Sequence, residues 1–158
     1  MNVKHNLKPI YDTNSKVLIL GSIPSEISRE KKFYYANKTN RFWPIFENIF
    51  NTKFLSDQEK IQFLINHNIA LWDVFKSVDI IKSIDSSIKN AKFNEIDKLL
   101  LKTNISAIFC TGKVAYNALI SHFNLDVEVF YLPSPSSANA SFSKEKLISE
   151  YKIILKYL

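Results

Sequence analysis

Four short, mostly apolar runs recur along the chain, and segments with apolar residues at helical spacing separate them. The runs are Val17 to Leu20, Ile69 to Trp72, Ile105 to Cys110 and Val127 to Leu132, and each predicts a strand. The first run is continuous and ends in Gly21, which is typical of a strand buried on both faces. Because strands that alternate with helices form parallel sheets, we expect an α/β fold. Its predicted form is a three-layer α/β/α sandwich around a central, mainly parallel four-stranded sheet, in a single domain over residues 1–158.

The segments between these runs predict the helices, because their apolar residues recur at helical spacing or follow a capping residue. They are Phe42 to Phe50, a helix opened by Ser56 to Glu59, a helix capped by Asn94, a helix over Val114 to Ile120, and Lys144 to Tyr157. The stretch from Asp73 to Ser87 instead indicates a long polar loop, with regular pattern only around Val78 to Ile81.

Polar residues follow the strands at one predicted edge of the sheet. Ser22-Ile23-Pro24, Asp73 and Ser134 to Asn139 all come directly after strands. Open α/β sheets bind ligands at this edge, so these segments should converge with the turn Tyr34 to Trp43. Asn40, at the centre of that turn, either caps the helix that follows or, beside two Tyr, a Lys and an Arg, belongs to a ligand site.

Composition restricts the class of protein. An apolar fraction of 46% and a charged fraction of 23% are typical of a globular domain, and no apolar run approaches the length of a membrane span. The first residues lack the apolar segment of a secretory signal, so we expect a cytoplasmic protein. One cysteine, Cys110, and three scattered His predict no disulfide, metal or cofactor, and Cys110 is expected to be a buried structural thiol. The net charge of +6 permits a polyanionic partner.

Four strings occur in an order that matches a known family. They are Gly21-Ser22-Ile23-Pro24, Tyr34-Tyr35-Ala36 with Asn40-Arg41-Phe42-Trp43, Leu71-Trp72-Asp73-Val74, and Leu132 to Asn139. Together they resemble the uracil-DNA glycosylase superfamily, and within it the hypoxanthine-DNA glycosylase (DNA-deoxyinosine glycosylase) branch. The resemblance implies a monomeric, monofunctional enzyme that hydrolyses the N-glycosidic bond of hypoxanthine, and secondarily of uracil, in DNA. The product would be an abasic site, which initiates base excision repair.

The first string departs from the superfamily pattern. Most members carry an Asp or Asn that positions the attacking water between the Gly and Pro of this motif, whereas here Ile23 holds that place. An aliphatic side chain cannot orient water. The resemblance to the hypoxanthine branch implies that Asn40 takes over this role. A superfamily member that binds DNA or a nucleobase without cleaving it is the main alternative, and an unrelated nucleotide-binding domain lacks the glycine-rich loop it would need.

Cleavage requires a placed water, stabilisation of the departing base and access to an extruded nucleotide. The backbone N–H groups of Ser22 and Ile23 are candidates to stabilise the departing anion. Tyr35 is either a stacking platform for the base or an ordinary core aromatic. Asp73 either accepts a hydrogen bond from the ring N–H of a deaminated base or caps the turn after its strand.

The last string supplies candidate DNA contacts. Ser134 and Ser136 are candidates to hold phosphates, Ser137 and Ala138 to enter the gap that the extruded nucleotide leaves, and Asn139 to contact DNA beside them. Lys38, Arg41 and Lys113 would add attraction to phosphates, although a solvated surface is the default interpretation of any one Lys. The alternative for the Pro- and Ser-rich stretch is a simple turn.

Overall fold

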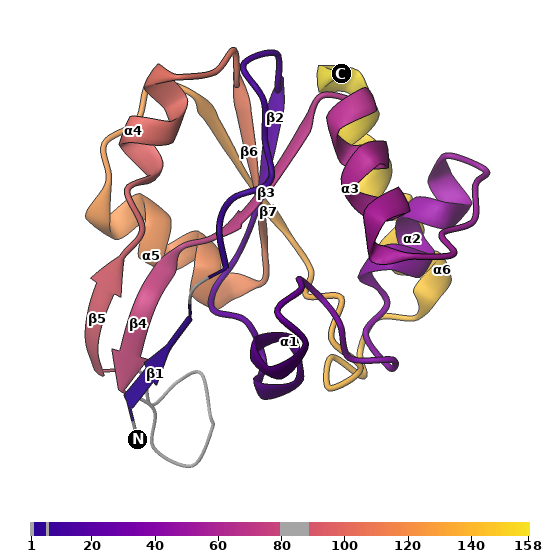
Figure 1. Cartoon of the computed structure of the whole chain (residues 1–158), viewed down its shortest axis with the longest axis horizontal. Helices are drawn as coiled ribbons and strands as arrows, with labels where there is room; N and C mark the ends of the chain where they lie inside the picture. Colours follow the sequence, from indigo (N-terminus) through magenta and orange to yellow (C-terminus); the bar gives the residue numbers. More distant parts are fainter. Residues whose placement is uncertain (1, 6, 80–88) are drawn as a thin grey trace.

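A four-stranded parallel sheet forms the centre of the computed structural model, which describes residues 2–5, 7–79 and 89–158 (Figure 1). Its strands run in the order β3-β2-β6-β7, and each neighbouring pair is parallel. Their bounds are β2 Val17–Gly21, β3 Ile69–Asp73, β6 Ala107–Thr111 and β7 Glu128–Leu132. The four predicted strands and the predicted α/β sandwich are therefore confirmed.

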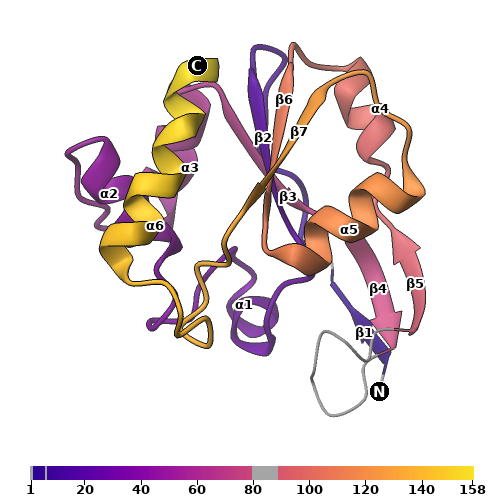
Figure 2. The same cartoon turned by 180° about the vertical axis from the view of Figure 1, so that it is seen from behind.

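Helices cover both faces of this sheet, as Figures 1 and 2 show from opposite sides. Side chains alternate along β2, so that Val17 and Ile19 pack in one apolar cluster and Leu18 and Leu20 in the other. The first cluster lies under α2, α3 and α6, and the second under α4 and α5. The helix bounds are α1 Glu26–Lys31, α2 Phe42–Ile49, α3 Asp57–Asn66, α4 Ile96–Leu101, α5 Lys113–His122 and α6 Lys144–Tyr151, which continues as the 3₁₀ helix η2 Lys152–Tyr157.

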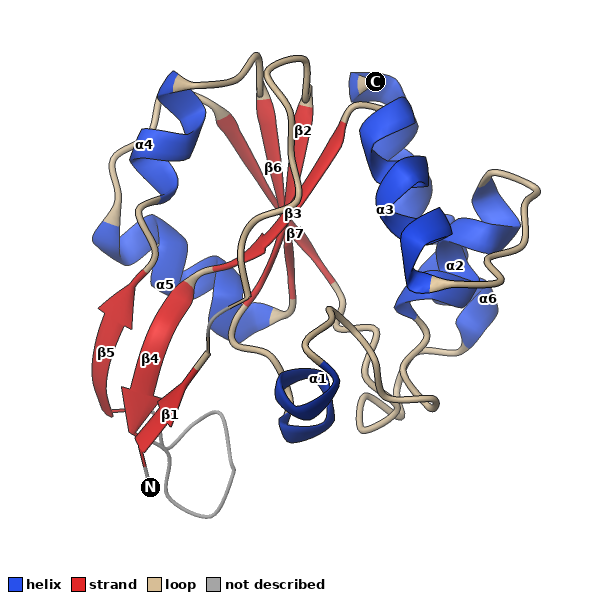
Figure 3. Cartoon of the chain, in the orientation of Figure 1, coloured by secondary structure: helices blue, strands red, loops and turns tan. Residues whose placement is uncertain are grey.

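A second, antiparallel sheet lies beside the sandwich, and the sequence analysis missed it. It consists of β1 Asn2–Lys4, β4 Phe75–Asp79 and β5 Lys89–Phe93, in the order β1-β4-β5 (Figure 3). The prediction of a long polar loop after Asp73 was wrong over Phe75–Asp79, where buried and exposed residues alternate for part of the strand. The predicted pattern at Ile80 and Ile81 and the loop residues up to Ser87 lie outside the described residues.

Asn94 does not cap a helix, which corrects another prediction. The residue that precedes α4 is Glu95, and its side chain makes no capping hydrogen bond. The buried Asn94 amide instead donates to the carbonyl oxygens of Asp73 and Phe75, at 2.8 and 3.3 Å. A side chain that was expected to start a helix thus fixes the backbone where β3 passes into β4.

The segments after the parallel strands gather at one end of the central sheet. Helix α1 lies below the carboxyl ends of the strands, beside the loop that connects β7 to α6, in both views (Figures 1 and 2). The turn between α1 and α2 reaches the same edge. Over the described part of the chain, none of the helices is both long and apolar enough to cross a membrane.

Candidate active site

Asp73, the last residue of β3, is a buried carboxyl group at this edge of the sheet. Its exposed fraction is 4%, and no described residue makes a hydrogen bond with its Oδ2. Burial penalises the charged form and raises the pKa of Asp73 from 3.8 to about 8. The carboxyl is therefore mostly protonated at neutral pH, and it then carries both a hydrogen-bond donor and an acceptor.

Gly21 allows this carboxyl to approach the end of β2. A Cβ atom on residue 21 would lie 2.6 Å from Oδ1 of Asp73 and 3.1 Å from the hydroxyl of Tyr35. Real Cβ atoms do not tolerate the shorter distance, so the two polar groups occupy space that only glycine leaves free. The backbone reinforces the junction, since the N–H of Val74 donates to the Gly21 carbonyl at 2.8 Å.

Tyr35 joins Asp73 from the turn after α1. Its hydroxyl is 2.9 Å from Oγ1 of Thr111, which in turn donates to the Leu20 carbonyl at 3.3 Å. Burial, followed by the nearby Asp73, raises the pKa of Tyr35. Three strand ends therefore meet around one phenol: β2 at Gly21, β3 at Asp73 and β6 at Thr111.

One face of the Tyr35 ring is already covered. It stacks on Phe42, with ring centroids 3.9 Å apart and an interplanar angle of 5°. The Tyr35 backbone adopts a left-handed conformation, φ 51°, which is unusual for an aromatic residue and directs the ring to the sheet edge. Tyr35 is half-buried, so its role as a stacking platform for a base stays a prediction.

Asn40 is half-buried, and its side-chain carbonyl is oriented by the helix that follows. Its Oδ1 accepts a hydrogen bond from the N–H of Phe42 at 2.9 Å, although the residue that caps α2 is Arg41. This short Asx turn resembles a cap in its effect, because it satisfies a free N–H of the first helical turn. An amide oxygen has two lone pairs, so one acceptor position remains besides this bond.

Arg41 holds the loop that connects β7 to α6. Its guanidinium donates to the carbonyl oxygens of Pro135, Ser136, Asn139 and Phe142, and its backbone N–H donates to Pro135 at 3.0 Å. Most of its donors are thus occupied by the protein itself. The observed contacts serve to fix this loop against the turn that carries Asn40, and the predicted phosphate contact of Arg41 stays a prediction.

The same loop is shaped by short side-chain turns. The hydroxyl of Ser134 accepts from the Ser136 N–H, and the hydroxyl of Ser136 accepts from the Ala138 N–H, each at 3.2 Å. The Asn139 amide donates to the Ser134 carbonyl at 3.0 Å. Ser137 and Ala138 are exposed at the tip, and Ser137 lies 3.1 Å from the Thr39 hydroxyl. The two loops therefore form one continuous rim.

The first motif offers backbone rather than side-chain chemistry. The Ile23 side chain is half-buried and packs against the apolar cluster under α4 and α5. Neither Ser22 nor Ile23 donates its backbone N–H to another described residue, while the Ser22 carbonyl accepts from Phe75 at 3.0 Å. Two adjacent N–H donors are thus left at the end of β2, as the predicted anion contact requires.

Other expectations concern residues at the margin of the site. Lys38 and Lys113 are exposed, the latter at the start of α5. Cys110 is fully buried in β6, where burial raises its pKa to about 12, so the expected burial of this thiol is confirmed. Among residues 2–5, 7–79 and 89–158, no three His, Cys, Asp or Glu side chains gather as a metal site.

Sequence reasoning missed three residues of the site: Gly21, Asn94 and Thr111. Gly21 was part of a motif but had no role assigned, although a lone Gly at a strand end often marks a close approach. Thr111 follows an apolar run directly, the same signal that singled out Asp73. Asn94 lies 21 residues from Asp73 in the sequence, and nothing local indicates their contact.

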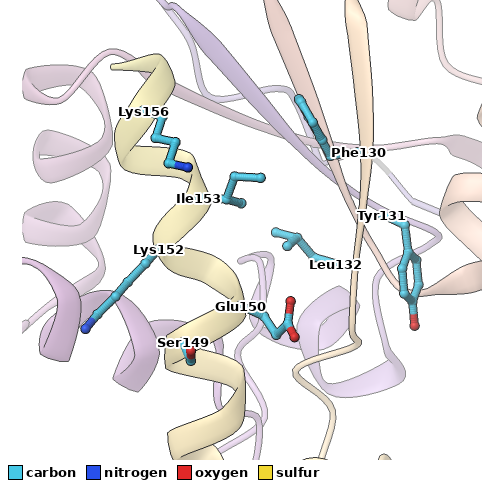
Figure 4. Close-up of a pocket in the computed structure, with 8 residues that line it drawn as sticks. All are labelled: Phe130, Tyr131, Leu132, Ser149, Glu150, Lys152, Ile153 and Lys156. Carbon is cyan, nitrogen blue, oxygen red and sulfur yellow. The ribbon is translucent and has the colours of Figure 1, made fainter.

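A surface groove elsewhere on the molecule does not coincide with this site. It has a volume of about 390 Å³ and lies between β7 and the helix formed by α6 and η2 (Figure 4). Phe130 and Ile153 line it together with Glu150, Lys152 and Lys156. None of the residues predicted for catalysis or DNA binding contributes to its wall.

Comparison with known proteins gives a consistent set of relatives. The family model of the uracil DNA glycosylase superfamily matches residues 8–158. A hypoxanthine DNA glycosylase from Methanosarcina acetivorans is 32% identical over 160 residues, which cover 98% of this chain and 99% of the relative. One from Methanosarcina barkeri is 28% identical, with 90% and 92% coverage.

A solved structure resembles the whole chain as well. It is a solution NMR structure of a Methanosarcina acetivorans protein assigned to the uracil DNA glycosylases. The two chains superpose with a TM-score of 0.84 at 32% identity, over 99% of this chain and 98% of the other. The similarity therefore extends over the sheet, its helices and the rim.

Proposed function

The chain belongs to the uracil DNA glycosylase superfamily and is a DNA glycosylase, and from this premise we propose that it removes hypoxanthine from DNA. The reaction would be hydrolysis of the N-glycosidic bond of deoxyinosine, with uracil as a slower substrate, and it would initiate base excision repair. The observation that carries the proposal is the buried carboxyl of Asp73 beside Tyr35 and Gly21, whose Oδ2 has no hydrogen-bond partner among the described residues. A base with a complementary polar edge would supply the missing hydrogen bond.

In this proposal Asp73 reads the edge of the base. A neutral carboxyl presents a donor and an acceptor side by side, and hypoxanthine presents a carbonyl oxygen next to a ring N–H. The two edges match as a cyclic pair of hydrogen bonds. Because the pKa of Asp73 is about 8, the neutral form is available at pH 7. Adenine can also pair with a neutral carboxyl, so its exclusion would depend on its being the poorer leaving group.

Asn40 would hold the attacking water. Phe42 fixes the amide through one hydrogen bond to Oδ1, and the second lone pair would accept a hydrogen bond from water. An amide is too weak a base to deprotonate water fully, so its contribution is placement, which suits a reaction with a dissociative, oxocarbenium-like transition state. Ile23 has no polar side-chain atom and cannot take over this task.

The departing base would be stabilised by the backbone. The N–H groups of Ser22 and Ile23 have no partner among the described residues, and they follow the same strand end that Asp73 adjoins. Fixed donors are most effective where negative charge develops during the reaction. The rim formed by Ser134 to Asn139 would contact the DNA on either side of the extruded nucleotide, with Lys38, Arg41 and Lys113 close to phosphates. We expect the enzyme to act as a cytoplasmic monomer.

Base release from defined oligonucleotides tests the proposal. Three otherwise identical strands would carry one inosine, one uracil or neither, and alkaline cleavage would report abasic sites. We expect cleavage of the inosine strand first, slower cleavage of the uracil strand and none of the third. Binding of all three strands without any cleavage would contradict the proposal and favour a catalytically silent member of the superfamily.

A further inference from the structure

A second cavity, of about 540 Å³, lies beside the turn Tyr34 to Trp43, which carries Asn40 and is called the active-site turn below. Its walls come from the N-terminal segment, the end of α1, the start of the active-site turn and one residue of α3. Four of the residues that line it are cations, namely Lys4, Lys8, Arg29 and Lys32. Leu7, Ile10 and Ile61 supply an apolar part of the same wall. The cavity therefore combines apolar surface with a dense group of positive charges.

Neither the cavity lining nor an ion pair neutralises these cations within the described residues. None of the residues lining the cavity is acidic, and none of the four cations forms an ion pair there. Three of the four are exposed lysines that solvent screens, so their positive potential remains available to an anion that enters the cavity. His5, which also lines the cavity, adds no charge at neutral pH, because burial is the main cause that lowers its pKa.

Hydrogen bonds fix the backbone around the cavity. The Tyr34 hydroxyl donates to the Lys8 carbonyl at 2.8 Å, which ties the N-terminal segment to the active-site turn. Arg29 donates to the Pro24 carbonyl at 2.9 Å, and Lys32 ends α1 in a left-handed conformation, φ 56°. A ligand would therefore meet positive charges whose backbone positions are already fixed.

The cavity shares a wall with the active site. Tyr34 lines the cavity, and the next residue, Tyr35, contacts Thr111 and lies against Asp73. We propose that this cavity binds the sugar-phosphate backbone of the DNA strand beside the extruded nucleotide, with the four cations on phosphate oxygens. This inference rests on the proposed function, since it assumes a DNA strand that passes the rim. The apolar wall would contact the deoxyribose or an unstacked base.

The groove in Figure 4 provides a matched control on the same molecule. It also contains two lysines, Lys152 and Lys156, but Glu150 lies in the same wall. It is built from β7, α6 and η2, whereas α1 and the active-site turn border the cationic cavity. Replacing two lysines in either place removes the same total charge. The comparison therefore separates the effect of where the lysines lie from the effect of net charge on DNA binding.

Fluorescence anisotropy on an undamaged, single-stranded oligonucleotide would test the proposal without any base release. The variant K8Q/K32Q is compared with K152Q/K156Q and the wild type over a series of salt concentrations. We expect K8Q/K32Q to bind about 10-fold more weakly and to reduce the slope of log affinity against log salt by about 1 to 1.5. The control variant should bind like the wild type.

Two results would overturn the proposal. Equal affinity and salt slope for the two variants would mean that the cavity makes no special contact with DNA. Loss of affinity for a free deoxynucleoside 5′-monophosphate or inorganic phosphate in K8Q/K32Q, with DNA binding unchanged, would assign the cavity to a small phosphate ligand instead. Failure of the proposed function would be seen in a different assay, as the absence of base release from the inosine strand. The difference in DNA affinity between the two variants would still be measured independently of base release.

Discussion

Two polar clusters at the same edge of the sheet differ in whether the protein satisfies them. The guanidinium of Arg41 donates to four backbone carbonyls, so its hydrogen-bonding capacity is nearly exhausted inside the fold. The carboxyl of Asp73 is more deeply buried than the half-buried Arg41, yet its Oδ2 has no partner among the described residues. The first arrangement stabilises the loop that it holds, while the second costs stability. A buried group retained at such a cost indicates a role in ligand binding. Arg41 therefore supports the structure of the site, and Asp73 belongs to the part that meets the ligand.

Removing the arginine should cause the largest change in stability. Arg41→Ala would leave the carbonyls of Ser136, Asn139 and Phe142 without this donor, and we expect the free energy of unfolding to fall by about 3–5 kcal/mol. Urea denaturation measures this. Lys38→Ala is the control, since Lys38 is an exposed cation three residues away and should change stability by less than about 0.5 kcal/mol. Equal losses of stability in Arg41→Ala and Lys38→Ala would show that the hydrogen bonds of Arg41 do not stabilise the loop.

Asp73→Asn, in contrast to Arg41→Ala, should gain stability relative to the wild type as the pH rises. The folded-state pKa of about 8 lies above the model-peptide value of 3.8, so the folded protein binds one more proton than the unfolded chain between these values. The wild type therefore loses stability as pH rises through this range, by at most roughly 1.4 kcal/mol per pH unit, and the loss stops above the folded pKa. Asparagine does not titrate, so the stability of Asp73→Asn lacks this dependence on pH.

We expect the stability of Asp73→Asn relative to the wild type to increase from pH 5 to pH 8, as measured by urea denaturation at each pH. Base release from inosine should be largely retained in Asp73→Asn and fall in Asp73→Ala, because an amide also presents a donor beside an acceptor whereas alanine presents neither. A stability difference that does not vary with pH would show that Asp73 is ionised in the folded protein.

A substitution at Gly21 tests the close packing around Asp73 with a smaller effect. Gly21→Ala places a Cβ within 2.6 Å of the Asp73 carboxyl, and we expect a loss of about 2 kcal/mol of stability. In an Asp73→Ala background the same change should cost at least about 1 kcal/mol less, since the closest atom is gone. Additive effects in this double-mutant cycle would show that the carboxyl does not occupy the space beside Gly21.

The sequence was sufficient to predict the central sheet, because its inner strands β2 and β6 are apolar runs buried on both faces and the edge strands β3 and β7 are also rich in apolar residues. It was not sufficient for β4 and β5, which carry charged residues, because β4 is held between β5 and the sequence-distant β1. The likeness to a family singled out Asn40 and Asp73. It could not show that Arg41 would bind carbonyls some 95 residues away, because that contact depends on how two loops meet in three dimensions.

The most direct test of the catalytic assignment is single-turnover release of hypoxanthine by Asn40→Ala, with Asn48→Ala as the matched control. Asn48 is exposed in α2, so its loss should leave the reaction unchanged. We predict that Asn40→Ala folds, loses about 1 kcal/mol of stability with its Asx turn, and still binds inosine-containing DNA. Its rate of base release should fall at least about 100-fold, since the attacking water loses its acceptor. An unchanged rate in Asn40→Ala would contradict the account and reduce Asn40 to a helix cap.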